Sequence, residues 1–168
     1  MADEHKPIGM DATGYDVLTN AVLELLNQYP ALDGKEIFFE QLDEASGIAF
    51  SADSGSLVMN ETEDILGGIK QECQYPFFIV YRTASTREYQ KLGVQGFLDG
   101  IGKWICQEPV EIGGKTVRLK SYPKLSQGRT IKRVTRMNSY GLEPNEDGVQ
   151  DWLLPVTVQY TNEIEPLW

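Results

Sequence analysis

Histidine and cysteine are scarce in this chain of 168 residues, which contains one histidine, His5, and two cysteines, Cys73 and Cys106. Catalytic groups of the Ser-His-Asp or Cys-His type need an imidazole held rigidly against its nucleophile. His5 lies in an N-terminal segment without periodicity, which we expect to be too loose for that task. A zinc site made of His and Cys needs three or four ligands, and one histidine with two distant cysteines does not supply them. We therefore expect neither kind of site.

Phosphate-binding and calcium-binding motifs are also missing. The sequence has no Gly-x-x-x-x-Gly-Lys-Ser/Thr loop, and its glycines between residues 93 and 102 fall inside a predicted helix. Residues 143–148 match the first positions of a calcium loop, but Leu154 stands where a bidentate carboxylate is required, so a long hairpin turn is the better interpretation. Paired carboxylates such as Glu61 and Glu63 arise by chance among twenty-five acids. We expect no enzyme, no cofactor and no metal, with an enzyme that uses only carboxylates as the remaining catalytic alternative.

Long hydrophobic runs are absent too. No apolar stretch approaches the roughly 20 residues that a transmembrane helix needs, and the N-terminus, Met1-Ala2-Asp3-Glu4, is acidic and polar. We therefore expect no signal peptide and no membrane partner, with both thiols reduced in a cytosol. Hydrophobic residues make up 41% of the chain and charged residues 24%, which is typical of a soluble globular domain.

The periodicity of apolar residues predicts one α+β domain at residues 12–168, preceded by a flexible arm at residues 1–11. One helix is expected to begin at a capping box of Thr13 and Asp16 and to end near Tyr29, before Pro30. A second helix is expected from its Ser85 cap to Cys106, with Gly93, Gly96 and Gly100 along one side. That glycine stripe indicates close packing inside the domain or, alternatively, a contact between subunits.

The remaining segments predict strands, and Gly67-Gly68 predicts a bulge within one of them. The fold class is therefore α+β, with two main helices packed on one face of a mostly antiparallel sheet. The expected strands are residues 37–42, 48–51, 57–59, 65–73, 76–83, 110–112, 116–119, 130–137 and 153–164.

Charge is distributed unevenly along the chain. Fifteen Lys and Arg oppose twenty-five Asp and Glu, so the formal net charge is −10, but residues 115–136 contain eight of the cations and no acid. Such an acidic protein is repelled by nucleic acid, and the basic window offers only Tyr122 as an aromatic and no recognition helix, so we expect no sequence-specific nucleic-acid binding. The simplest partner is another copy of the chain. The candidate subunit-interface residues are Arg118, Lys120, Lys124, Arg129, Lys132, Arg133 and Arg136.

The order of the elements carries a resemblance. A strand Tyr75-Pro76-Phe77-Phe78-Ile79-Val80-Tyr81 precedes a long helix, and a basic segment with Tyr122-Pro123-Lys124-Leu125 follows. Strand patterns at residues 131–136 and 152–160, joined through a turn from Gly141 to Gly148, complete the chain. From about residue 15 to residue 163, this order resembles the neck and tail-completion proteins of long-tailed bacteriophages and prophages, in particular the tail terminator family. The shared features are strand patterns and turns, without a catalytic signature.

The resemblance implies a structural protein of the virion, assembled in the cytoplasm of the bacterial host. Members of that family form rings, commonly hexameric, which cap the finished tail tube and present a surface to the head connector. The implied partners are therefore the chain itself, in a head-to-tail ring, and the tail-tube and head-connector proteins. Two alternatives remain: another minor capsid or head-completion protein of a phage, and a small acidic inhibitor or immunity protein that covers a basic target.

Overall fold

Two strands of fifteen residues, β5 (Ile69–Thr83) and β10 (Gln150–Ile164), pair antiparallel along their whole length at the centre of the main sheet. Alternate side chains of both strands are buried, as the period of two in a strand requires. The structure is a computed structural model that describes residues 6–84 and 88–166, without the side chains of residues 88–92. His5 and the expected Ser85 cap lie outside the described residues. The alternate side chains of β5 and β10 that are buried are those of Cys73, Tyr75, Phe77, Ile79, Trp152, Leu154, Val156, Val158 and Tyr160.

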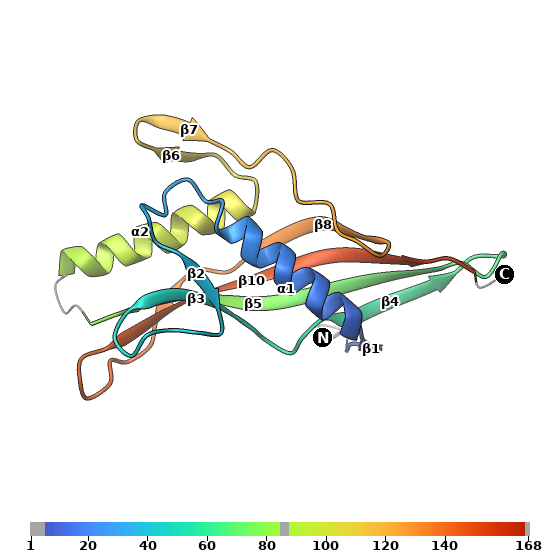
Figure 1. The fold of residues 1–168 in the computed structure, drawn as a ribbon, viewed down its shortest axis with the longest axis horizontal. Coiled ribbons are helices and arrows are strands. Elements are labelled where there is room, and N and C mark those ends of the chain that lie inside the picture. The colour runs from blue at the N-terminus through green and yellow to red at the C-terminus, as the bar shows by residue number, and fades with distance from the viewer. Residues whose placement is uncertain (1–5, 85–87, 167–168) are drawn as a thin grey trace, which may run out of the picture.

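The main sheet has eight strands, with the order β1-β4-β5-β10-β8 along its principal path (Figure 1). Three further strands extend it: β3 pairs with β5 and carries β2 on its other side, while β9 pairs with β10. Every pair is antiparallel except β2–β3, and β6 and β7 form a separate hairpin. The bounds are β1 (Gly9–Met10), β2 (Ile37–Phe39), β3 (Gly47–Ala52), β4 (Leu57–Glu63), β6 (Val110–Ile112), β7 (Lys115–Val117), β8 (Arg129–Arg136) and β9 (Tyr140–Gly141).

Two helices, α1 (Ala12–Leu26) and α2 (Glu88–Ile105), pack against the buried face of this sheet (Figure 1). Leu18, Val22 and Leu26 of α1 join the same hydrophobic cluster as Leu98 and Ile101 of α2. The predicted fold class is therefore confirmed: the protein is a single α+β domain with two helices, one mostly antiparallel sheet and a small hairpin.

One expected break in the sheet does not exist, because residues 76–83 and the second half of the expected strand at 65–73 form the continuous strand β5. Pro76 lacks an N–H, but its carbonyl accepts a hydrogen bond from the Asp53 amide. The N–H and C=O of a strand residue point to the same side, so the missing donor also faces residue 53. On that side β3 ends opposite Phe77 and β4 begins opposite Gln74, which leaves a loop beside Pro76. The proline therefore costs no hydrogen bond to β10.

The prediction of a strand is also wrong for residues 65–68, for a different reason. Residues 64–68 form the tight turn that joins β4 to β5, and Gly67 adopts φ +86° there. The Asp64 carboxylate accepts hydrogen bonds from the Leu66 and Gly68 amides at 2.8 Å each. Gly67-Gly68 therefore makes a hairpin turn, not a bulge.

The start of α1 also differs from the prediction. Asp11, not Thr13, is the N-cap, and its Oδ1 accepts the Gly14 amide at 3.0 Å. The helix ends at Leu26 because the side chain of Asn27 bonds the Leu23 carbonyl and both backbone groups of Ile37. The prediction of a flexible arm at residues 1–11 is wrong for its last three residues, since Gly9–Met10 pair with β4 and Asp11 is buried.

A buried ion pair joins the beginning of α1 to two strands. Arg129 Nε donates to Asp11 Oδ2 at 2.9 Å, and the Tyr160 hydroxyl donates to the same oxygen at 2.7 Å. Both charged side chains are 6% exposed. Burial alone would raise the pKa of Asp11, but the hydrogen bonds from Arg129, Tyr160 and the Gly14 amide outweigh it and hold the pKa below its usual value. The carboxylate therefore stays ionised in the core.

Replacing Asp11 by Asn tests this contact. D11N leaves the Arg129 guanidinium buried without a counter-charge, so we expect unfolding by urea at pH 7 to show a loss of about 3–5 kcal/mol. The exposed Asp16 of the same helix supplies the control, D16N, which should stay within about 0.5 kcal/mol of wild type. Because the folded pKa of Asp11 is lowered, its contribution is present at neutral pH and is lost as the pH falls below about 4. A D11N deficit that does not shrink in acid contradicts this account.

The glycines give a second test. Gly100 faces the Tyr29 hydroxyl, so the packing interpretation of the glycine stripe holds for it, whereas a Cβ at Gly93 or Gly96 meets nothing within 4 Å. A Cβ at Gly14 would overlap the Asp11 carboxylate.

We expect G96A to stabilise the protein by up to about 1 kcal/mol through helix propensity, and G14A to destabilise it by about 1–3 kcal/mol. Thermal unfolding of both variants measures the contrast, and a destabilising G96A would mean that something covers that side of α2.

Candidate interaction surface

The structure divides the seven cations predicted for a subunit interface into two groups. Arg129 is buried against Asp11 and is unavailable to a partner, so the prediction is wrong for this residue. Arg136 is also directed inward: its side chain is 18% exposed and lies 3.2 Å from Glu108 and 3.9 Å from Asp99. Arg129 lies two residues before buried Ile131, and Arg136 lies two residues after buried Val134. Both arginine side chains therefore lie on the face of β8 that is directed into the domain.

The other five cations are exposed, and we call them the basic surface: Arg118, Lys120, Lys124, Lys132 and Arg133. The segment that follows β7 is fixed to the end of α2, since Arg118 Nε donates to the Gln107 carbonyl at 2.7 Å and the Tyr122 hydroxyl donates to the Ile105 carbonyl at 2.8 Å. A hollow of about 480 Å³ separates this segment from β8, with Tyr122 on one side and Lys132 and Arg133 on the other. The segment and β8 thus present one positive region.

The basic surface follows an edge of the sheet. β8 is the last strand in the order and pairs with β10 on one side only, as far as the described residues show. Thr130, Lys132 and Arg133 are exposed along it. The side chain of Tyr122 lies against the outer side of β8, so this edge is not open along its whole length. Lys or Arg on a strand edge discourages pairing with a like edge.

The opposite edge of the sheet is acidic. β1 pairs with β4 only at Leu57 and Val58, so no described strand pairs with the outer side of Asn60–Glu63. We call residues 60–72, which form the end of β4, the turn and the start of β5, the acidic hairpin. It carries exposed Glu61, Glu63, Asp64 and Glu72, with Lys70 as its one cation. Beside it, the end of β10 adds exposed Glu163, and exposed Glu165 follows the strand.

The tip of the acidic hairpin is apolar. Ile65 is fully exposed and Leu66 is 62% exposed, on the turn that Asp64 fixes. Figure 1 shows this turn near the C-terminal end of the described chain, at one extreme of the long axis and beyond both helices. The sequence analysis predicted a strand for Ile65 and Leu66 and interpreted Glu61 and Glu63 only as a pair of acids that arises by chance. The Gly67-Gly68 pair after an acid was the available signal for a turn.

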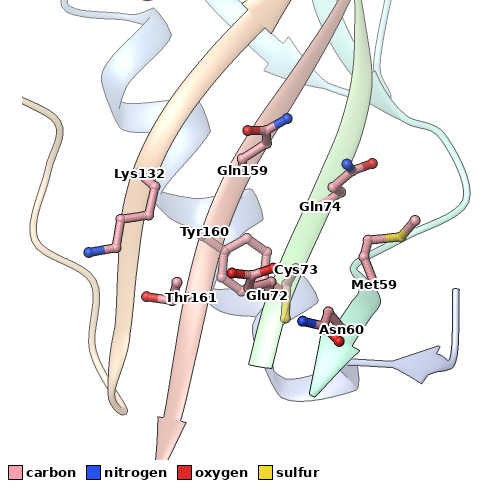
Figure 2. A pocket seen from close by; sticks show the side chains of 9 residues that line it. All are labelled: Met59, Asn60, Glu72, Cys73, Gln74, Lys132, Gln159, Tyr160 and Thr161. Atoms are coloured by element: carbon pink, nitrogen blue, oxygen red, sulfur yellow. The ribbon is translucent and has the colours of Figure 1, made fainter. Parts of the chain in front are cut away.

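Between the two edges, the sheet face opposite the helices is hollowed (Figure 2). The hollow measures about 590 Å³, and side chains from β4, β5, β10 and β8 surround it. Glu72 and Lys132 lie on different strands, with Gln159 and Thr161 between them (Figure 2). Burial raises the pKa of the Cys73 thiol to about 11 and also raises the pKa of the Tyr160 hydroxyl, so both stay protonated at neutral pH. The arrangement offers hydrogen-bonding groups, not an activated nucleophile.

The loop that matches the first positions of a calcium loop is a turn. Residues 143–148 form a turn, as predicted, in which Asn145 Oδ1 accepts the amides of Asp147 and Val149. Among the described side chains, those of residues 6–84 and 93–166, no group of three or more His, Cys, Asp and Glu is placed to hold a metal ion. Along residues 6–84 and 88–166, no helix is both long and apolar enough to cross a membrane.

Comparison with known proteins adds no family to this description. No protein-family model matches the sequence, and no curated protein matches it. The interpretation of function therefore rests on the two charged edges and on the resemblance in the order of elements.

Two neighbouring arginines test the division of the basic window. R136E places a third carboxylate near Glu108 and Asp99, so we expect it to lower the free energy of unfolding by about 1–3 kcal/mol. R133E changes an exposed side chain by the same charge, so its unfolding should stay within about 0.5 kcal/mol of wild type. Urea unfolding followed by circular dichroism measures both. Equal losses in the two variants would show that Arg136 is not held inside the domain.

Proposed function

We propose that this chain is a ring-forming structural protein of a bacteriophage or prophage tail. In this role it resembles a tail terminator, capping the tail tube and joining it to the head connector. The observation that carries the proposal is the placement of opposite charges on opposite edges of one sheet, at β4 and β8. The order of elements along the chain supports the assignment to a phage neck.

A single copy cannot join these two edges. β5 and β10 separate β4 from β8, and at about 4.8 Å per strand step the two edges stand roughly 14 Å apart on one rigid sheet. The acidic edge of one copy can meet the basic edge only of another copy. Such a contact uses two different surfaces, so it repeats from head to tail and closes into a ring when the rotation between copies allows.

The overall charge fits the same role. The net charge of −10 leaves an acidic exterior once the basic surface is covered. An acidic channel repels DNA and lets it pass without binding. The tail-tube and head-connector proteins would then contact the two faces of the ring.

Molar mass in solution tests the proposal. Light scattering of the whole chain, from dilute to concentrated protein at low salt, should show a closed oligomer, with a hexamer as the expectation from the resemblance. Because the contact is between charges, raising the salt should shift the mass toward the 18.9 kDa of one chain. A protein that remains monomeric in every condition contradicts self-assembly, and tight binding of that monomer to one basic protein would identify an inhibitor.

A further inference from the structure

We infer that the acidic hairpin of one copy docks on the β8 edge of a second copy, so that its apolar tip and its carboxylates contact the basic surface there. The inference rests on the proposed function and names the surfaces through which the chain assembles. Three observations on different parts of the molecule support it.

The first observation is charge complementarity on unpaired edges. Exposed Glu61 and Glu63 lie on β4, while exposed Lys132 and Arg133 lie on β8. Two β8 edges repel each other, and so do two β4 edges, because like charges would meet. Among the pairings of these two edges, only β4 against β8 brings opposite charges together. The charges therefore select a head-to-tail partner and reject a two-fold dimer through either edge.

The second observation is the apolar tip. Ile65 and Leu66 project into solvent from a turn that two hydrogen bonds to Asp64 hold in place. Burial of an Ile or Leu side chain is favourable because it removes apolar surface from water, and these two side chains are largely exposed in the single chain. A preformed tip loses little conformational entropy when it binds.

The third observation is the nature of the receiving surface. The segment beside β8 includes half-buried Tyr122, Pro123 and Leu125 around the exposed Lys124. It therefore combines apolar contact area with positive charge, which matches the combination of apolar tip and carboxylates on the acidic hairpin. Interfaces commonly place such apolar groups at the centre and the charges at the rim.

Reversing the charges of each surface separately tests the inference. One variant carries E61K and E63K, and the other carries K132E and R133E; all four side chains are exposed, so circular dichroism should show the wild-type fold. Each variant alone brings like charges together, so we expect its self-association to weaken about a hundredfold or more. In an equimolar mixture, every contact can again join opposite charges when the two variants alternate. Light scattering of the mixture should therefore recover the wild-type oligomer.

A matched control uses the exposed acids of a different turn. E143K with E146K changes the net charge by the same amount as E61K with E63K, on the turn between β9 and β10, which belongs to neither edge, and should leave the oligomer intact. I65S with L66S leaves the charge unchanged and should weaken association in wild-type and mixed samples alike.

The possible outcomes distinguish a failure of the docking inference from a failure of the proposed function. If wild type assembles and either charge-reversed variant assembles equally well alone, the inference is wrong and the proposed function stands. If both variants are monomeric and their mixture also stays monomeric, the acidic hairpin and the β8 edge are not partners. If wild type never assembles, the proposed function fails, and the docking surface fails with it.

Discussion

The buried contact of Asp11 with Arg129 and Tyr160 is the constraint on which the arrangement of the molecule depends. It joins residues 118 and 149 positions apart in the sequence, and it fixes the first turn of α1 against the beginning of β8 and the far half of β10. Asp11 also caps α1, so one carboxylate serves both the helix and the sheet. Removing either charge would leave the other unpaired in the core, which is far more costly than losing a surface ion pair. The position of the basic edge is therefore coupled to the core of the domain.

Local sequence patterns predicted the fold class because the spacing of apolar residues reflects which side chains are buried. Alternation marked β10, and helical spacing marked α1 and α2, since each element buries one face. The same patterns did not reveal the ion pair, because neither charge signals a partner more than a hundred residues away. Composition alone did not distinguish buried Arg129 from exposed Lys132 and Arg133. The strand period contained the missing signal: Arg129 is two residues before buried Ile131 and shares its face.

Titratable groups with raised pKa values lie in or against the core of the domain, whereas the charged groups behind the proposed assembly lie at its surface. Burial raises the pKa values of Cys73, Tyr75 and Tyr122, so these groups hold their protons at neutral pH. Catalytic sites instead combine groups whose pKa values are pushed apart within one cleft. The exposed features extend across the molecule: two edges of opposite charge, an apolar tip and a hollow between the two edges. The proposed assembly rests on these surfaces.

Electron microscopy of the purified chain at low salt tests the central claim, head-to-tail assembly through two different edges, most directly. The account predicts closed rings around a central opening, in which each copy contacts its two neighbours through different surfaces. Two-fold dimers, in which acidic hairpin meets acidic hairpin or β8 meets β8, would contradict it. Images that show only separate single copies, in agreement with a single-chain mass from light scattering, would also contradict it.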